Sequence, residues 1–309
     1  METGQKAIRD IKPVLSANMA EALALFRRDT VPDDAAVHDI RVLMKKCRAI
    51  FKLISPGVGD AVYLREYSVF RDTGRALAAL RESSVHRKTL KSLGKNHKAL
   101  FRRLEANDRI RPLLEMGEKP ICINGEGIPG TGNTFAALGK SAFRIRFMPL
   151  KNLAGNDMFR NLMASYNAVC ESYLACRISP RPASLHFLRK RVKDLLYQLY
   201  FFRDFNPGKV RSMERKLDGI AQNLGSYNDL AQLEKVIGYD ARGGQRFPEM
   251  DELMIVIRDR QDKYLAKIWP VAFGIFCPGH DLSDILGFSS RSFQDEAVAE
   301  TDESGKDDL

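Results

Sequence analysis

The chain has 309 residues, of which 44% are hydrophobic, and it carries a formal net charge of +10. That apolar content is enough for a sizeable core in one large domain or two modest ones. The five cysteines are odd in number and contain no Cys-x-x-Cys pair, which excludes a disulfide framework and indicates a reducing compartment. The longest apolar run, near Ile268–Cys277, contains Pro270 and is too short to span a bilayer. We therefore expect a soluble, cytoplasmic protein with no membrane partner.

Helical periodicity dominates the sequence. Helices are predicted at 11–28, from His38 to 54, and at 60–82, 86–106, 157–178, 186–205, 209–225, 229–237 and 250–276. Residues 107–155 are rich in glycine, and within them Ile121–Ile123 and Phe143–Phe147 are candidate strands. The chain from Ser289 to Leu309 contains seven acidic and two basic residues and is predicted to be disordered.

These elements divide the chain into four parts. Residues 1–106 are predicted to form a first helical bundle, 107–155 an irregular connector, 156–280 a second helical bundle and 281–309 an acidic tail. The tail carries a charge of −5 from residue 289 onward, so residues 1–288 carry +15. A body this basic usually binds an anion such as nucleic acid, a phosphate polymer or an acidic membrane face. On composition alone, a merely soluble and charged surface is the alternative.

Two helical segments carry the same basic pattern, His-x-(Ile/Leu)-Arg-x-x-x-Lys, beginning at His38 and at His186. On a helix, the basic side chains of each segment fall on one face and the apolar side chains on the opposite face. One face therefore packs into a core while the other presents a line of positive charge. We call these lines the first stripe (His38, Arg41, Lys45, Arg48, Lys52) and the second stripe (His186, Arg189, Lys190, Lys193).

An acidic residue follows each stripe at nearly the same distance. Glu82 comes 44 positions after His38, and Asp229 comes 43 positions after His186; both are predicted to lie in short turns. Two matches in the same order and at the same spacing predict a duplicated unit with a duplicated basic site. Alternatively, each histidine caps or hydrogen-bonds its neighbours, and each acid pairs with nearby arginines to hold its stripe in place.

The two stripes, together with the segments Arg71–Glu82 and Leu224–Leu230, resemble the conserved histidine α-helical domain, called CHAD, over about residues 10–280. The resemblance implies an all-α fold of two four-helix bundles related by a pseudo-two-fold axis, with the stripes lining a basic central groove or pore. It also implies binding of inorganic polyphosphate and association with polyphosphate granules. Family members are often fused to a triphosphate tunnel domain that carries Glu-x-Glu-x-Lys, and no Glu-x-Glu occurs in this sequence.

The chemistry of polyphosphate agrees with this expectation. Each phosphate carries negative charge, so a row of cations at helix-face spacing matches the polymer better than one deep pocket does. Arginine can grip two phosphate oxygens, and lysine supplies a point charge. The residues expected to bind polyphosphate are His38, Arg41, Lys45, Arg48, Lys52, Arg71, Arg75, His186, Arg189, Lys190 and Lys193.

The sequence contains no complete catalytic motif. Gly139–Ser141 looks like the end of a phosphate-binding P-loop, but Thr134 stands where that motif needs glycine. No carboxylate cluster suggests the divalent-metal site that phosphoryl transfer uses. We therefore expect a protein that is not an enzyme, with no metal site and no cofactor.

Two other functional classes remain open. A histidine phosphotransfer module is also a helical bundle with a similar motif, but its usual next residue is glycine, where Val42 and Lys190 stand here. A helical nucleic-acid binder would need stacking side chains beside a stripe, and Tyr197 and Tyr200 are the candidates. The sequence leaves the oligomeric state undetermined.

Overall fold

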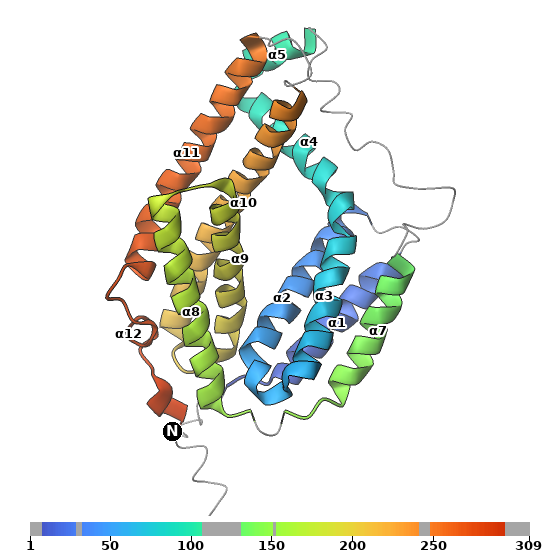
Figure 1. The fold of residues 1–309 in the computed structure, drawn as a ribbon, viewed down its shortest axis with the longest axis vertical. Helices are drawn as coiled ribbons and strands as arrows, with labels where there is room; N and C mark the ends of the chain where they lie inside the picture. The colour runs from blue at the N-terminus through green and yellow to red at the C-terminus, as the bar shows by residue number, and fades with distance from the viewer. Residues whose placement is uncertain (1–7, 29–32, 107–130, 151–152, 241–247, 294–309) are drawn as a thin grey trace, which may run out of the picture.

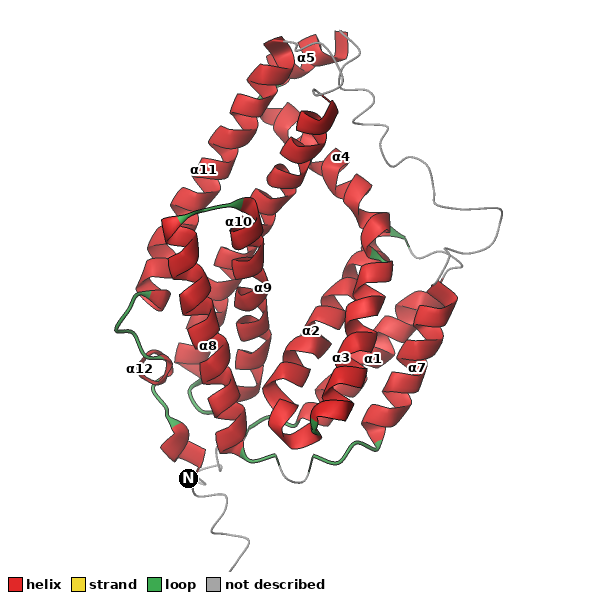
Figure 2. Cartoon of the chain, in the orientation of Figure 1, coloured by secondary structure: helices red, strands yellow, loops and turns green. Residues whose placement is uncertain are grey.

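The computed structural model describes residues 8–28, 33–106, 131–150, 153–240 and 248–293. The candidate strand Ile121–Ile123 and the predicted disordered tail beyond 293 lie outside these ranges. The described chain is all-α and contains no strand (Figure 2). None of its helices is long and apolar enough to cross a membrane.

The helices form two groups that lie beside each other. Figure 1 shows α1, α2, α3 and α7 on one side of the molecule and α8, α9, α10 and α11 on the other, while α4 and α5 extend to the ends of α10 and α11. The bounds are α1 (Ile11–Arg28), α2 (Asp34–Val58), α3 (Asp60–Ala76), α4 (Ala78–Asn96), α5 (Lys98–Ala106), α7 (Thr131–Arg146), α8 (Gly155–Ile178), α9 (Pro182–Leu199), η1 (Tyr200–Phe202), α10 (Pro207–Asp240), α11 (Pro248–Phe276), α12 (Leu282–Leu286) and η2 (Ser290–Phe293).

Helices α2 and α9 carry the two stripes, and both bury the apolar face that the sequence predicts. The N-cap of α2 is Asp33, whose carboxylate accepts a hydrogen bond from the backbone N–H of Ala36. Helix α9 starts at Pro182, where the missing N–H costs no helical hydrogen bond. The buried side chains of the two faces are Ile40, Leu43, Met44, Cys47, Ile50, Phe51 and Ile54 on α2, and Leu188, Val192, Leu195 and Leu199 on α9.

A single large hydrophobic core joins the two groups of helices, because α2 packs against both α8 and α9. A polar contact within this core fixes the crossing of α2 and α9: the buried Nε2 of Gln198 donates to the carbonyl of Ala49 at 3.0 Å. A second, smaller core lies where α4 and α5 meet α10 and α11. Both interfaces therefore hold the first part of the chain against the second.

Several predicted helix boundaries are wrong. The helix predicted over 60–82 ends at Ala76, and α4 begins at Ala78 after a break at Leu77. The helices predicted at 209–225 and 229–237 form one helix, α10, because Leu224 and Leu230 are buried on both sides of Gly225 and their packing outweighs the poor helix propensity of glycine. The segments around Glu82 and Asp229 are therefore helical, not turns.

The prediction of a strand at Phe143–Phe147 is also wrong. The prediction that 107–155 is irregular throughout is wrong as well, because part of it is helical. Residues 131–146 form α7, which packs on α1 and α3. Alternating apolar and basic residues imitate a strand here, but the buried side chains Leu138 and Ile145 follow helical spacing, whereas Phe143 and Phe147 are exposed.

A buried carboxylate fixes α7 against α3. The side chain of Glu66 on α3 is 1% exposed and accepts hydrogen bonds from Ser141 at 2.5 Å and from Arg144 at 2.6 and 2.9 Å. Burial alone would raise the pKa of Glu66, but the hydrogen bonds from Arg144, Ser141 and Arg65 outweigh it and lower that pKa. Residue Ser141 of the P-loop-like segment thus has a structural partner inside the bundle.

Candidate functional site

A cavity of about 760 Å³ lies between α2 and α3 on one side and α8 and α9 on the other. Among the described residues that line it, ten are lysine or arginine and one, Asp194, is acidic. We call it the basic cavity. Its charged and histidine lining residues are Arg41, Lys45, Arg48 and Lys52 of α2, Arg71 and Arg75 of α3, and His186, Arg189, Lys190, Arg191, Lys193 and Asp194 of α9.

The structure brings ten of the eleven predicted site residues to this cavity and leaves out His38. His38 is exposed near the start of α2. His186 is half-buried in the cavity wall, so the two histidines have different surroundings in the folded protein.

An equivalent hydrogen bond anchors one arginine in each stripe. Arg41 donates through Nη1 to the carbonyl of Gly74, 33 residues later, and Arg189 donates through Nε to the carbonyl of Ala221, 32 residues later. Each bond joins a stripe to the next long helix and holds the guanidinium at the cavity wall. The matched separation is what a duplicated unit would produce.

Gly225 on α10 makes room for Arg189. A Cβ atom at this position would lie 3.1 Å from Nε and 3.2 Å from Nη2 of Arg189. Since real Cβ contacts are rarely this short, a larger residue would make the guanidinium shift by a few tenths of an ångström. Glycine at this position thus lets α9 and α10 approach each other with an arginine between them.

Three carboxylates offset part of the positive charge. Lys52 donates to Asp194 at 2.5 Å, Lys193 donates to Asp218 at 2.9 Å, and Arg71 forms two hydrogen bonds with Asp72 at 2.8 and 3.0 Å. Burial opposes the charge on Lys52, but the attraction of Asp194 outweighs it and raises the pKa of Lys52. Lys52 and Lys193, the last cations of the two stripes, are therefore held in place by acids, as is Arg71. The sequence did not predict these pairs.

The sequence profile of the CHAD domain matches residues 15–116 and 138–237, which together exceed half of the chain and contain both stripes. The protein belongs to the CHAD family. The fold is similar to that in the crystal structure of the CHAD domain from the plant Ricinus communis, with a TM-score of 0.53, 17% identity, and coverage of 88% of this chain and 93% of the other. No curated protein matches the sequence significantly.

In this CHAD protein, His186 lies half-buried in the cavity wall, where its surroundings disfavour the protonated ring. Burial lowers the pKa of His186, and the positive charges of Lys190, Arg189 and Lys45 lower it further, while hydrogen bonding to Asn228 opposes the shift. The Nδ1 atom is buried and has no hydrogen-bond partner among the described residues. An anion bound beside the ring would favour its protonated form and supply a partner.

Several cavity residues were missing from the predicted site. Arg191 lines the cavity and could have been predicted, because it directly follows Arg189 and Lys190 in the sequence. Its guanidinium lies 4.6 Å from the ring centroid of Phe187. Asn161 of α8 donates to the carbonyls of Lys52 and Leu53 at 3.2 and 3.0 Å. No charge pattern marks Asn161, because α8 reaches the cavity only through the tertiary fold.

Proposed function

We propose that this CHAD protein binds inorganic polyphosphate in the basic cavity. The observation that carries the proposal is the gathering of ten lysine and arginine side chains, from two segments far apart in sequence, around one cavity with one lining carboxylate. Such a concentration of cations matches a polyanion better than a singly charged metabolite. The family resemblance implies the same ligand, and an association with polyphosphate granules in the cytoplasm.

The spacing of the cations suits a flexible phosphate chain. Arg41, Lys45, Arg48 and Lys52 follow one another at three or four residues along α2, so they form a row on one face of the helix. Arg189, Lys190 and Lys193 supply a second row on α9. A chain lying between the rows would meet guanidinium groups that can each grip two oxygens and would release its condensed counterions on binding.

We further propose that the two halves are four-helix bundles derived by duplication and related by a pseudo-two-fold axis, with the basic cavity as the groove between them. The bonds of Arg41 to Gly74 and of Arg189 to Ala221, at nearly equal separation along the chain, support this proposal. The division of the family match into two segments of similar length also supports it.

We propose that binding is not accompanied by catalysis. Asp194, which lines the cavity, and Asp72 and Asp218, which pair with cations that line it, are each engaged by an arginine or a lysine. A carboxylate in such a pair is poorly placed to hold the divalent ions that phosphoryl transfer uses. The described residues contain no group of three potential metal ligands.

The decisive experiment compares polyphosphate with single-stranded RNA of equal total charge in calorimetric titrations at the same ionic strength. We expect tight binding of polyphosphate and weak binding of RNA, because the three aromatic residues that line the cavity are already engaged: Tyr67 stacks on Tyr63, Phe70 packs against Phe51, and Arg191 lies over Phe187. The polymer should be recovered at its original length after incubation with magnesium. Equal affinity for both polymers would indicate a general polyanion binder, and stable phosphorylation of His38 or His186 by a phosphodonor would indicate a phosphotransfer module.

Replacing Gly225 with alanine should weaken polyphosphate binding several-fold while leaving the fold at least as stable. The added Cβ shifts the Arg189 guanidinium by a few tenths of an ångström and strains its hydrogen bond to Ala221, whereas alanine in a helix interior is favoured over glycine by about 1 kcal/mol. Gly219→Ala on the same helix is the matched control, because a Cβ there meets nothing within 4 Å. Thermal melts and titrations of both variants check this; unchanged affinity in Gly225→Ala would show that the position of Arg189 does not matter.

A further inference from the structure

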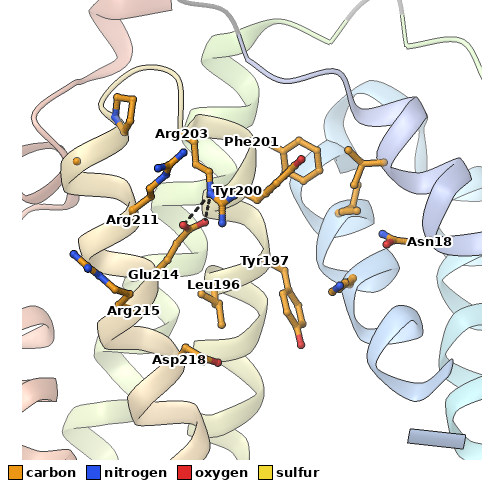
Figure 3. Close-up of a pocket in the computed structure, with 15 residues that line it drawn as sticks. Asn18, Leu196, Tyr197, Tyr200, Phe201, Arg203, Arg211, Glu214, Arg215 and Asp218 are labelled. Atoms are coloured by element: carbon orange, nitrogen blue, oxygen red, sulfur yellow. Dashed lines mark hydrogen bonds and ion pairs between the residues drawn. The ribbon is translucent and has the colours of Figure 1, made fainter. Parts of the chain in front are cut away.

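A second cavity, of about 860 Å³, lies between α1 and α2 on one side and α9, η1 and α10 on the other (Figure 3). It shares no described lining residue with the basic cavity. Lys45 and Lys46 show how α2 serves both: consecutive helical side chains point about 100° apart, so Lys45 lines the basic cavity and Lys46 the second cavity. Lys193 and Asp218 form an ion pair between the two cavities.

The second cavity has unbalanced positive charge. Its basic lining residues are Lys46, Arg203, Arg211 and Arg215, and its acidic ones are Glu214 and Asp218. Both acids are already engaged: Arg203 donates to both carboxylate oxygens of Glu214 at 2.9 Å, and Asp218 accepts from Lys193. Arg211 and Arg215 stand four residues apart on α10, a spacing at which like charges repel. A bound anion with several negative charges would relieve this repulsion.

The opposite wall, formed by α1 and α2, is apolar apart from Lys46 and Asn18, and Asn18 is an unsatisfied donor. Val14 and Ile50 line this wall together with Asn18 of α1, whose side chain is 9% exposed. The Nδ2 group of Asn18 is buried and has no hydrogen-bond partner among the described residues. Leaving a buried donor unpaired is unfavourable, so an acceptor on a ligand bound in this cavity would gain a hydrogen bond from Asn18. Figure 3 shows Asn18 across the cavity from Tyr197 and from the arginines of α10.

We propose that the second cavity binds a nucleoside di- or triphosphate or a close chemical analogue. The phosphates lie toward Lys46, Arg211 and Arg215, and the ring system lies against Ile50, Leu196 and Tyr197, with a ring acceptor bonded to Asn18. The volume is within the range of about 300–1,000 Å³ that small-molecule sites occupy. This proposal does not depend on polyphosphate binding, because a different set of residues carries it.

The test titrates the full chain with ATP, adenosine and inorganic tripolyphosphate in the presence of EDTA. ATP should saturate one site per chain that tripolyphosphate does not fill with equal affinity. Arg211→Glu combined with Arg215→Glu should weaken ATP binding at least about tenfold and leave binding of long polyphosphate unchanged. Both arginines are exposed on α10, so the variant should fold.

The Asn18→Leu variant tests the apolar end of the second cavity independently of its arginines. It should weaken ATP binding about fivefold or more through the lost hydrogen bond, while the melting temperature stays the same or rises because the unpaired buried donor is gone. Charge reversal of Lys45 and Lys190 in the basic cavity is the control and should leave ATP affinity within about twofold. The proposal is overturned if wild-type protein binds no ATP at millimolar concentration, or if ATP binding is lost in the basic-cavity variant and kept in the Arg211 and Arg215 variant.

Discussion

Replacing both Lys45 and Lys190 with glutamate should weaken polyphosphate binding by at least about 100-fold at low salt. The two residues line the basic cavity from α2 and from α9, and the positive charge of each lowers the pKa of His186. Each hydrogen bond to a charged group contributes about 1.5–3 kcal/mol, and every 1.4 kcal/mol changes affinity about tenfold. Titrations at several salt concentrations should also show a flatter salt dependence, because fewer phosphate contacts release counterions.

The single substitutions separate one shared site from two independent ones. If a polymer contacts both stripes together, Lys45→Glu and Lys190→Glu should each lower the affinity of the whole site without changing the number of sites per chain. If instead the halves bind separately, each single variant should keep one site of full affinity, and the shared cavity would be refuted. Lys235→Glu combined with Lys267→Glu is the matched control, because both lysines are exposed and neither lines the basic cavity or the second cavity.

Glu66→Gln should lower the free energy of unfolding by about 2–3 kcal/mol at pH 7, since it removes the charge that holds Arg144 and leaves a buried network partly unsatisfied. Urea denaturation of the wild type and the variant measures the difference. Glu105→Gln on the exposed end of α5 is the control and should change stability by no more than about 0.5 kcal/mol.

The stabilisation by Glu66 should depend on pH in a defined direction. The pKa of Glu66 is lowered below its ordinary value of 4.5 in the folded protein. Its contribution is therefore fully present above pH 4.5 and is lost as the pH falls through the lowered value. The difference between the wild type and Glu66→Gln should shrink over that acid range; a constant difference would show that the ionised carboxylate is not what stabilises the contact between α3 and α7.

The sequence by itself predicted the helical class and the faces of α2 and α9, because helical periodicity is a local property. Ile40, Cys47 and Phe51 fall on the apolar side of α2 by spacing alone, and all three are buried. The basic side chains on the other face were equally predictable. The family, too, follows from local motifs, since the histidine-led stripes recur within short segments of the chain.

Element boundaries depended on contacts that local patterns do not contain. Gly225 suggested a break in the chain, yet α10 continues through it because α9 and α11 pack against it and Arg189 fills the space that a side chain would take. The alternation from Phe143 to Phe147 suggested a strand, yet the docking of Ser141 and Arg144 on Glu66 stabilises a helix there.

Only the tertiary structure decided how the charged residues are grouped. The crossing of α2 and α9 brings Lys52 to Asp194, 142 residues away, and places Arg189 and Lys45 around one cavity while leaving His38 outside it. The same crossing divides the neighbours Lys45 and Lys46 between two cavities. Periodicity fixes the face of a helix on which a side chain lies, but what that face meets depends on long-range packing of apolar surfaces from distant parts of the chain.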